Sequence, residues 1–176
     1  RSNLNLKKNL KKKYDFLFIS IFRHPNTMLN AHFDLLKTMN SFFSSKKEKL
    51  YVLGSSGINS KEEKLFYDAY LQDTNYIFIP REKKRPTYDI IDQSNIILTV
   101  ESTLGYEALA RGNKVAYFSI RKNSYPDNTA KFGWPANKKD SGPFWVNSTD
   151  IFTFKKLINY LETIKVDDYL KILKNN

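Results

Sequence analysis

The stretch Asn95-Ile-Ile-Leu-Thr-Val-Glu-Ser-Thr-Leu-Gly-Tyr-Glu-Ala-Leu-Ala-Arg-Gly112 changes from one periodicity to another within a few residues. Residues 95–100 are almost all strand-favouring and predict a buried strand. Residues 103–110 predict a helix that stops at Gly112, a residue suited to a left-handed C-terminal cap. A strand that leads directly into a helix is the repeating unit of a parallel α/β sheet.

The chain on either side repeats this unit. Short apolar runs predict further strands at 14–22, 50–53, 76–79 and 115–119. Apolar residues at helical spacing predict helices that run from a cap at Asn26 or Thr27 to Phe43, from the capping-box pattern Ser60-Lys-Glu-Glu63 to Tyr70, from Thr87 to Ile91, from a cap at Asp150 to Leu161, and from Asp167 to Leu173.

This order predicts a fold class. Strands separated by single helices imply right-handed crossovers, and therefore an α/β, Rossmann-like parallel sheet with helices on both faces. We divide the chain into a basic lead-in or linker (1–13), a Rossmann-like domain (14–149) with a long loop at 120–147, and C-terminal helices that pack on the domain (150–176).

Composition sets limits on the function. The chain has 176 residues, of which 41% are hydrophobic and 15% aromatic, enough to fill one substantial core. Its longest apolar runs are strand-sized, so no membrane-spanning helix is predicted. Cysteine is absent, which excludes disulfides and thiolate metal sites and fits a reducing, cytoplasmic compartment. No metal-ligand spacing, catalytic triad or P-loop is present.

The net charge is +11, and residues 1–13 carry six of the positive charges without an acid. Such a tail could contact an anionic membrane, at its inner face, or nucleic acid. A solvated charge run is the simpler alternative. The chain opens on Arg1, from which we expect a piece of a longer protein.

The helix entry after residues 95–100 is a candidate phosphate site. Ligands of open parallel sheets bind at the carboxyl ends of the strands, where helix N-termini attract anions. Ser102, Thr103, Leu104 and Gly105 occupy that entry, and Gly105 removes a side chain where a diphosphate would lie. Glu107 lies one turn further on and could accept hydrogen bonds from two ribose hydroxyls. The alternative is an ordinary capped helix whose glutamate favours the dipole.

A family resemblance favours the first interpretation. The string Ser102-Thr-x-Gly-x-Glu-Ala-Leu-Ala-x-Gly-x-x-Val115 resembles the donor-site signature in the C-terminal domain of GT-B glycosyltransferases, most closely bacterial surface-carbohydrate and capsule enzymes. Phe132-Gly-Trp-Pro135 and Gly142-Pro-Phe-Trp145 also resemble elements of surface carbohydrate biosynthesis proteins. The chain departs from many members at Asn113-Lys114, where they have glycine or proline, and this leaves the branch open.

The resemblance implies further site residues. It implies that Glu107 binds ribose and that Arg23, after the first strand, contacts the donor diphosphate. Ile79, Pro80 and Arg81, after the third strand, would meet the nucleobase, although Arg81 could equally be a solvated charge.

Two groups after the fifth strand are candidates for rim contacts. Arg121 and Lys122 would face a phosphate or an acidic sugar, or form a free surface pair. Trp134, Phe144 and Trp145 could stack on a sugar face, or could instead pin the long loop to the core.

These expectations together describe a nucleotide-sugar-binding domain of a glycosyltransferase for bacterial surface polysaccharide or lipopolysaccharide. The resemblance implies a UDP-, GDP- or CMP-linked sugar as donor, a saccharide as acceptor, no cofactor and no metal. The catalytic base would lie in an N-terminal domain missing from this chain.

Three alternatives stay open. A nucleotide-sugar 2-epimerase uses a similar architecture but brings additional acids and histidines to the sugar, whereas this chain has two histidines. A basic nucleic-acid-binding module would explain the charge and the eleven tyrosines, but not the helix entry with its inward glutamate. A non-catalytic interaction domain is the third.

Overall fold

The computed structural model describes residues 10–23, 28–55, 59–81, 87–121, 131–136 and 138–175. Within them the chain alternates strands and helices almost throughout. In chain order the elements are β1 (Tyr14–Ile19), α1 (Asn30–Phe43), β2 (Leu50–Leu53), α2 (Ser60–Tyr70), β3 (Tyr76–Ile79), α3 (Thr87–Asp92), β4 (Ser94–Thr99), α4 (Thr103–Ala110), β5 (Lys114–Phe118), β6 (Trp145–Val146), α5 (Ile151–Thr163) and α6 (Val166–Lys174).

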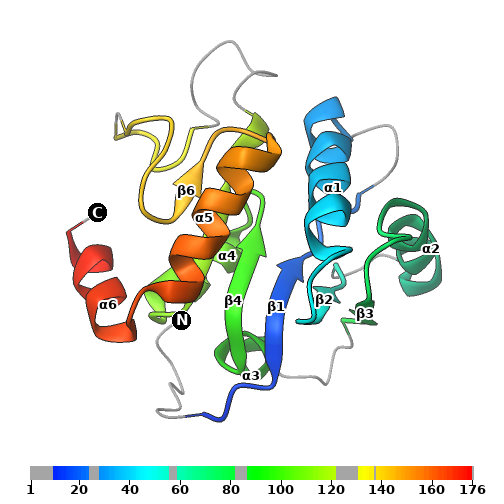
Figure 1. Cartoon of the computed structure of the whole chain (residues 1–176), viewed down its shortest axis with the longest axis horizontal. Helices are drawn as coiled ribbons and strands as arrows, with labels where there is room; N and C mark the ends of the chain where they lie inside the picture. Colours follow the sequence, from blue (N-terminus) through cyan, green and yellow to red (C-terminus); the bar gives the residue numbers. More distant parts are fainter. Residues whose placement is uncertain are drawn as a thin grey trace.

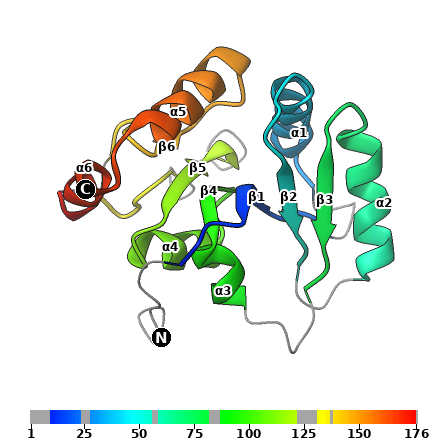
Figure 2. The same ribbon diagram turned by 60° about the horizontal axis from the view of Figure 1, so that its bottom comes forward.

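The strands form one parallel sheet in the order β3-β2-β1-β4-β5-β6. Helices α1 and α5 lie over one face and α3 and α4 over the other (Figures 1 and 2). The predicted α/β Rossmann-like fold is therefore confirmed. The chain leaves β1 toward β2 on one side and continues from β4 toward β5 on the other, so the strand order reverses between these neighbours. A crevice for ligands is expected at their carboxyl ends.

Most predicted boundaries shift by only one or two residues, but three differ for physical reasons. β1 ends at Ile19 rather than residue 22, because Ile21 and Phe22 turn their amides to side chains instead of a neighbouring strand. α1 begins at Asn30 with Leu29 as its N-cap, while Asn26 and Thr27 lie outside the described residues. β6 lies inside the segment predicted to be a loop, because two residues leave too short a pattern to detect.

The capping box predicted at Ser60-Lys-Glu-Glu63 is wrong. Asn59 caps α2 instead, with its side chain accepting from the Lys61 amide at 3.0 Å. Glu63 is 1% exposed, and its carboxylate accepts the Ser55 amide, at 2.9 Å to Oε1. The glutamate therefore ties α2 to the end of β2.

The C-terminal helices complete the hydrophobic core. On α5, Phe154 stacks on Phe118 of β5 with ring centroids 5.2 Å apart. On α6, the buried Tyr169 hydroxyl accepts a hydrogen bond from the Val115 amide at 3.0 Å. Among the described residues, no helix has both the length and the apolar character needed to cross a bilayer.

The end of the basic lead-in contributes to the fold. Lys12 donates from Nζ to the carbonyl oxygens of Asp92 and Ser94, at 3.0 and 2.8 Å. Burial lowers the pKa of Lys12, with Asp92 acting in the opposite direction. This exposed lysine of the basic run is thus tied to the base of β4 through its ammonium group.

Candidate functional site

A cavity of about 470 Å³ opens at the carboxyl ends of β1 and β4, at the point where the strand order reverses. Its volume lies within the range of small-molecule sites, about 300–1,000 Å³. The lining comes from the segments that follow β1, β2, β3, β4 and β5 and from helices α1 and α4: Ile19, Ser20, Ile21, Phe22, Arg23, Met28, His32, Gly54, Ser55, Arg81, Val100, Glu101, Ser102, Thr103, Leu104, Glu107 and Arg121.

The entry of α4 forms one wall. Ser102 is the N-cap, and its hydroxyl accepts from the Leu104 amide at 3.2 Å, while its carbonyl accepts from the Gly105 amide at 2.9 Å. Within the described part of the chain, the Thr103 amide has no acceptor, and Thr103 lines the cavity. A free amide and the positive end of the helix dipole meet at this point, an arrangement suited to an anion.

The turn before α4 is held in a strained backbone. Glu101 has φ of 46°, a left-handed conformation that costs energy for any residue with a side chain. Its carboxylate accepts from the Ser119 hydroxyl at 3.2 Å and from the Arg121 amide at 3.3 Å, and it pairs with the Arg121 guanidinium at 3.4 Å. Burial raises the pKa of Glu101, against these contacts. The glutamate thus ties the end of β4 to the segment after β5.

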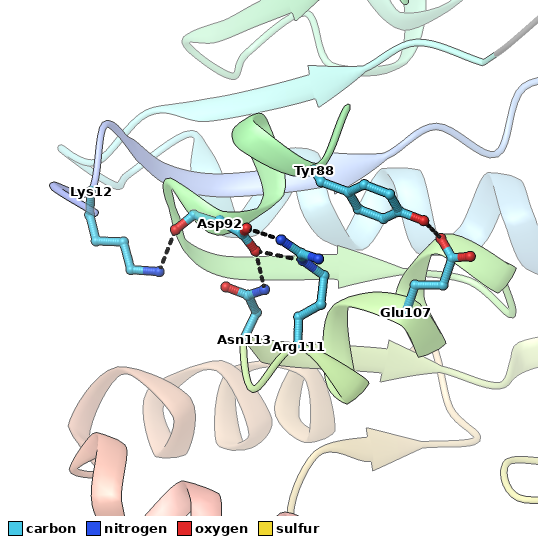
Figure 3. Close-up of polar contacts among 6 residues, drawn as sticks. All are labelled: Lys12, Tyr88, Asp92, Glu107, Arg111 and Asn113. Carbon is cyan, nitrogen blue, oxygen red and sulfur yellow. Dashed lines mark hydrogen bonds and ion pairs between the residues drawn. The ribbon is translucent and has the colours of Figure 1, made fainter. Parts of the chain in front are cut away.

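Glu107 lies one turn into α4 and lines the same cavity. The Tyr88 hydroxyl of α3 donates to its Oε2 at 2.9 Å (Figure 3). This hydrogen bond to the carboxylate raises the pKa of Tyr88. The sequence placed Glu107 toward the mouth of the sheet correctly, but gave no sign of its tyrosine partner.

The opposite wall contains a buried polar cluster beneath the ends of β1 and β2. The Ser20 hydroxyl bonds to Oε1 of Glu63 at 2.5 Å and to the Tyr67 hydroxyl at 2.8 Å. The Tyr67 hydroxyl also accepts the Ile21 amide at 3.0 Å. Three backbone amides of this wall, those of Ile21, Phe22 and Ser55, are therefore occupied by the protein's own side chains.

His32 of α1 is a site residue that sequence reasoning missed. Its Nδ1 accepts from the Leu29 amide at 3.0 Å, so the neutral ring carries its proton on Nε2. Burial, followed by the charges of Arg121 and Arg23, lowers its pKa to about 4. A neutral imidazole beside two arginines is the consequence.

The charges of the lining favour an anionic ligand. Three arginines, Arg23, Arg81 and Arg121, face two carboxylates, of which Glu101 is already engaged with Arg121. Guanidinium groups bind phosphate and carboxylate with paired donors. Among the described residues, no three His, Asp or Glu side chains are arranged to hold a metal ion.

The structure brings seven of the predicted site residues to this cavity: Arg23, Arg81, Ser102, Thr103, Leu104, Glu107 and Arg121. Ile79, Pro80, Gly105 and Trp134 are outside the lining, and Lys122 lies outside the described residues. Residues far apart in the chain meet here because the carboxyl ends of parallel strands share one edge of the sheet.

The residues outside the lining have other surroundings. The Ile79 carbonyl accepts from the Gly54 amide at 2.9 Å, so it continues the β2–β3 ladder. Gly105 is buried against β4, where an added Cβ would lie 2.5 Å from Cγ2 of Thr99. Close packing of helix on strand therefore accounts for this glycine, and the approach of a diphosphate to it stays a prediction.

The three aromatic residues predicted either to stack on a sugar or to pin the long loop to the core differ in their surroundings. Phe144 and Trp145 are buried, and Trp145 stacks on Phe132 with centroids 4.7 Å apart, so they pin the loop to the core. Trp134 is 60% exposed and lies away from the cavity lining. Its predicted contact with a sugar has no support from this arrangement.

Two other lining residues that were not predicted could have been found from the order of the strands. Ser20 follows β1 directly and Ser55 stands two residues after β2, and the rule that ligands bind at strand ends could have found them. His32 carries no such signal, because it lies in the first turn of α1 within an ordinary apolar pattern.

Among solved structures, the chain is similar to the UDP-GlcNAc 2-epimerase of Neisseria meningitidis, determined with UDP-GlcNAc bound. The TM-score is 0.53 at 14% sequence identity, over 93% of this chain and 40% of the epimerase. This likeness shows a shared fold. The chain spans less than half the length of that enzyme. A search of curated proteins found no match.

A sequence profile of a protein family matches residues 12–176, nearly the whole chain. The match includes the α4 entry, Glu107 and the aromatic loop. The chain therefore belongs to the family described as "putative O-antigen biosynthesis protein".

Proposed function

We propose that this chain binds a nucleotide-activated sugar in the cavity at the ends of β1 and β4, as the donor-binding half of a glycosyltransferase for surface polysaccharide. The observation that carries the proposal is the convergence of the α4 entry and the Glu107 carboxylate on one cavity of about 470 Å³. Family membership and a fold shared with an enzyme of nucleotide-sugar chemistry support it.

Each part of a nucleotide sugar has a chemical counterpart in the lining. The Thr103 amide, the dipole of α4 and the arginines suit a diphosphate. Glu107 suits a vicinal diol, because a carboxylate can accept from two adjacent hydroxyls. Arg81, after β3, is the candidate neighbour of the nucleobase, and Arg23 and Arg121 are the candidate neighbours of the phosphates.

The mechanism follows from this arrangement. The acceptor hydroxyl would attack the anomeric carbon, and the bond from that carbon to the phosphate oxygen would break with its electrons leaving on the nucleotide. The helix entry and guanidinium groups would stabilise that departing charge, while the cavity fixes the position of the donor. The general base and the saccharide acceptor site would lie in a second domain. The basic N-terminus would serve peripheral contact with an anionic membrane.

A nucleotide-sugar 2-epimerase is the second candidate, favoured by the structural neighbour. The described cavity brings one histidine and two glutamates, with His32 and Glu101 both held by internal bonds. This set offers few free groups to move protons at a sugar carbon. Incubation with UDP-GlcNAc tests the epimerase, because an epimerase yields a sugar inverted at C2, whereas a donor-binding half without its acceptor site should bind a nucleotide sugar and leave it unchanged.

Binding is tested by calorimetry with UDP-, GDP- and CMP-sugars on the wild type, Glu107→Ala and Glu62→Ala. Glu62 is the matched control, an exposed acid on α2 outside the cavity lining whose removal makes the same change in charge. We expect one nucleotide class to bind the wild type and Glu62→Ala equally. We expect Glu107→Ala to bind it at least about tenfold more weakly, since about 1.4 kcal/mol of a charge-assisted contact is lost.

Two results would contradict the proposal. One is that no nucleotide sugar binds the wild type. The other is that Glu107→Ala binds as tightly as Glu62→Ala. Salt-sensitive oligonucleotide binding that survives Glu107→Ala would favour a nucleic-acid-binding module instead.

A further inference from the structure

Tyr88 reaches Glu107 from a separate helix. It lies in α3, which follows β3, whereas Glu107 lies in α4, which follows β4. The hydroxyl of Tyr88 donates to Oε2 of Glu107 at 2.9 Å, and Oε1 has no hydrogen-bond partner among the described residues. Figure 3 shows the tyrosine ring extending toward the carboxylate from above Arg111.

The tyrosine ring itself is held from below. The guanidinium carbon of Arg111 lies 4.7 Å from the centroid of the Tyr88 ring, a cation–π contact. Arg111 in turn donates to both carboxylate oxygens of Asp92, from Nε at 2.9 Å and from NH2. Asn113 donates to the same carboxylate at 3.1 Å.

This support is buried. The side chains of Arg111 and Asp92 are 1% and 8% exposed, so the pair is shielded from water. Burial alone would raise the pKa of Asp92, but the bonds from Arg111 and Asn113 outweigh it and lower that pKa. The Asp92–Arg111 pair therefore lies at the buried end of a row of contacts, in which the half-exposed Tyr88 packs on Arg111 and donates to Glu107 (Figure 3).

A carboxylate held in this way has a defined set of free acceptor sites. An ionised carboxylate has about four lone-pair sites, and the tyrosine uses one of them on Oε2. The other lone-pair sites remain for a ligand, and the carboxylate already has its orientation before the ligand binds. A side chain ordered beforehand loses less conformational entropy on binding, and this increases affinity.

We propose that Tyr88 is a positioning residue, which fixes the Glu107 carboxylate so that its remaining oxygen sites meet the vicinal diol of a ribose. This inference rests on the proposed nucleotide-sugar function. It goes further, because it assigns the discrimination between ribose and deoxyribose to a side chain outside the cavity lining. A purely structural link between α3 and α4 would leave that discrimination unchanged.

The test is a ratio of affinities measured by calorimetry with the pairs UDP and 2′-deoxy-UDP, GDP and 2′-deoxy-GDP, and CMP and 2′-deoxy-CMP. The proteins are the wild type, Glu107→Ala, Tyr88→Phe and Tyr76→Phe. Tyr76 is the matched control, since its hydroxyl also donates to a carboxylate, Asp68 Oδ1 at 2.5 Å, away from the cavity. Each ratio compares two ligands on one protein, so a partly destabilised variant still reports it.

We expect the wild type and Tyr76→Phe to prefer the ribonucleotide by about tenfold, the effect of one lost charge-assisted hydrogen bond. Tyr88→Phe should reduce this preference about three- to fivefold, with little change in affinity for the 2′-deoxy ligand. Glu107→Ala should abolish the preference.

The outcomes separate this inference from the proposed function. If Glu107→Ala loses the ribose preference while Tyr88→Phe keeps it in full, the positioning role is refuted and the binding site stands. If the wild type binds a nucleotide without preferring ribose, the pairing of Glu107 with ribose is refuted together with the role of Tyr88. If no nucleotide binds the wild type, both proposals fail.

Discussion

Substitution of Gly105 by alanine tests why a glycine stands in the first turn of α4. An alanine Cβ at this position would lie 2.5 Å from Cγ2 and 2.9 Å from Oγ1 of Thr99 on β4. Carbon atoms in contact normally lie about 3.5–4.0 Å apart, so helix and strand would have to separate by roughly 1 Å. The glycine is therefore expected to set how closely α4 packs on the sheet.

The magnitude follows from two opposing effects. Overpacking a tight interior typically costs about 1–3 kcal/mol. Alanine favours a helix over glycine by at most about 1 kcal/mol. We expect Gly105→Ala to lower the free energy of unfolding by about 1–2 kcal/mol, which corresponds to a decrease in Tm of about 2–8 °C for a chain of this size.

The assay is urea unfolding of a double-mutant cycle with Thr99→Ala. This second change removes Cγ2 and Oγ1 and leaves the Thr99 Cβ 3.1 Å from the added methyl. On the Thr99→Ala background, Gly105→Ala should cost less than about 0.5 kcal/mol, because the two closest atoms are gone and the remaining carbon at 3.1 Å has to move only slightly. An equal cost on both backgrounds, or a gain in stability on the wild-type background, would refute this reasoning.

The same cycle separates packing from ligand contact at Gly105. If the glycine serves packing, the double variant should bind a nucleotide sugar as well as Thr99→Ala does. If a diphosphate instead needs the space that a side chain at residue 105 would fill, as the sequence alone suggested, the double variant should recover its stability and still lose binding.

Two further predictions concern the opposite wall. Glu63→Ala should lower the free energy of unfolding in urea by about 2–4 kcal/mol, because Ser20 and the Ser55 amide lose a buried acceptor. The exposed Glu62→Ala is the control. A cost below about 1 kcal/mol for Glu63→Ala, comparable to that of Glu62→Ala, would show that Glu63 does not tie α2 to the end of β2. His32 has a folded pKa of about 4 and an unfolded pKa of about 6.5, so the unfolded chain takes up a proton first as the pH falls. Its contribution to stability is therefore complete above about pH 6.5 and is lost progressively toward pH 4. Between pH 7.5 and pH 5 the wild type should lose about 1–2 kcal/mol more than His32→Asn, whose amide oxygen can also accept the Leu29 amide, and parallel pH profiles would contradict this.

Much of the fold could be predicted from the sequence because its elements are short and strongly patterned. The runs at β2 and β3 and the helix of α4 were bounded correctly, since apolar strand formers end at proline, glycine or a capping residue. β6 could not be predicted, because Trp145–Val146 becomes a strand only by pairing with Tyr117 and Phe118 of β5. Gly142 adds a constraint within the same turn, since a Cβ there would lie 2.1 Å from the Trp145 ring.

The site was predictable where it depends on helix and strand ends, and not where it depends on side chains meeting across elements. Ser102 and Thr103 follow from the α4 entry, and Glu107 from helical spacing. Glu63 was assigned to a helix cap from local spacing, but the tertiary fold turns it toward Ser20 and Ser55. The Tyr88–Glu107 contact joins residues 19 positions apart, and no local periodicity reports such a pair.

The central claim is that the cavity between the ends of β1 and β4 holds a nucleotide sugar. A crystal structure of this chain with the nucleotide sugar that binds in calorimetry tests it most directly. We predict a phosphate oxygen within hydrogen-bond distance of the Thr103 amide and ribose hydroxyls within hydrogen-bond distance of the Glu107 carboxylate. A nucleotide bound elsewhere on the domain, or bound in this cavity with its ribose away from Glu107, would contradict the account.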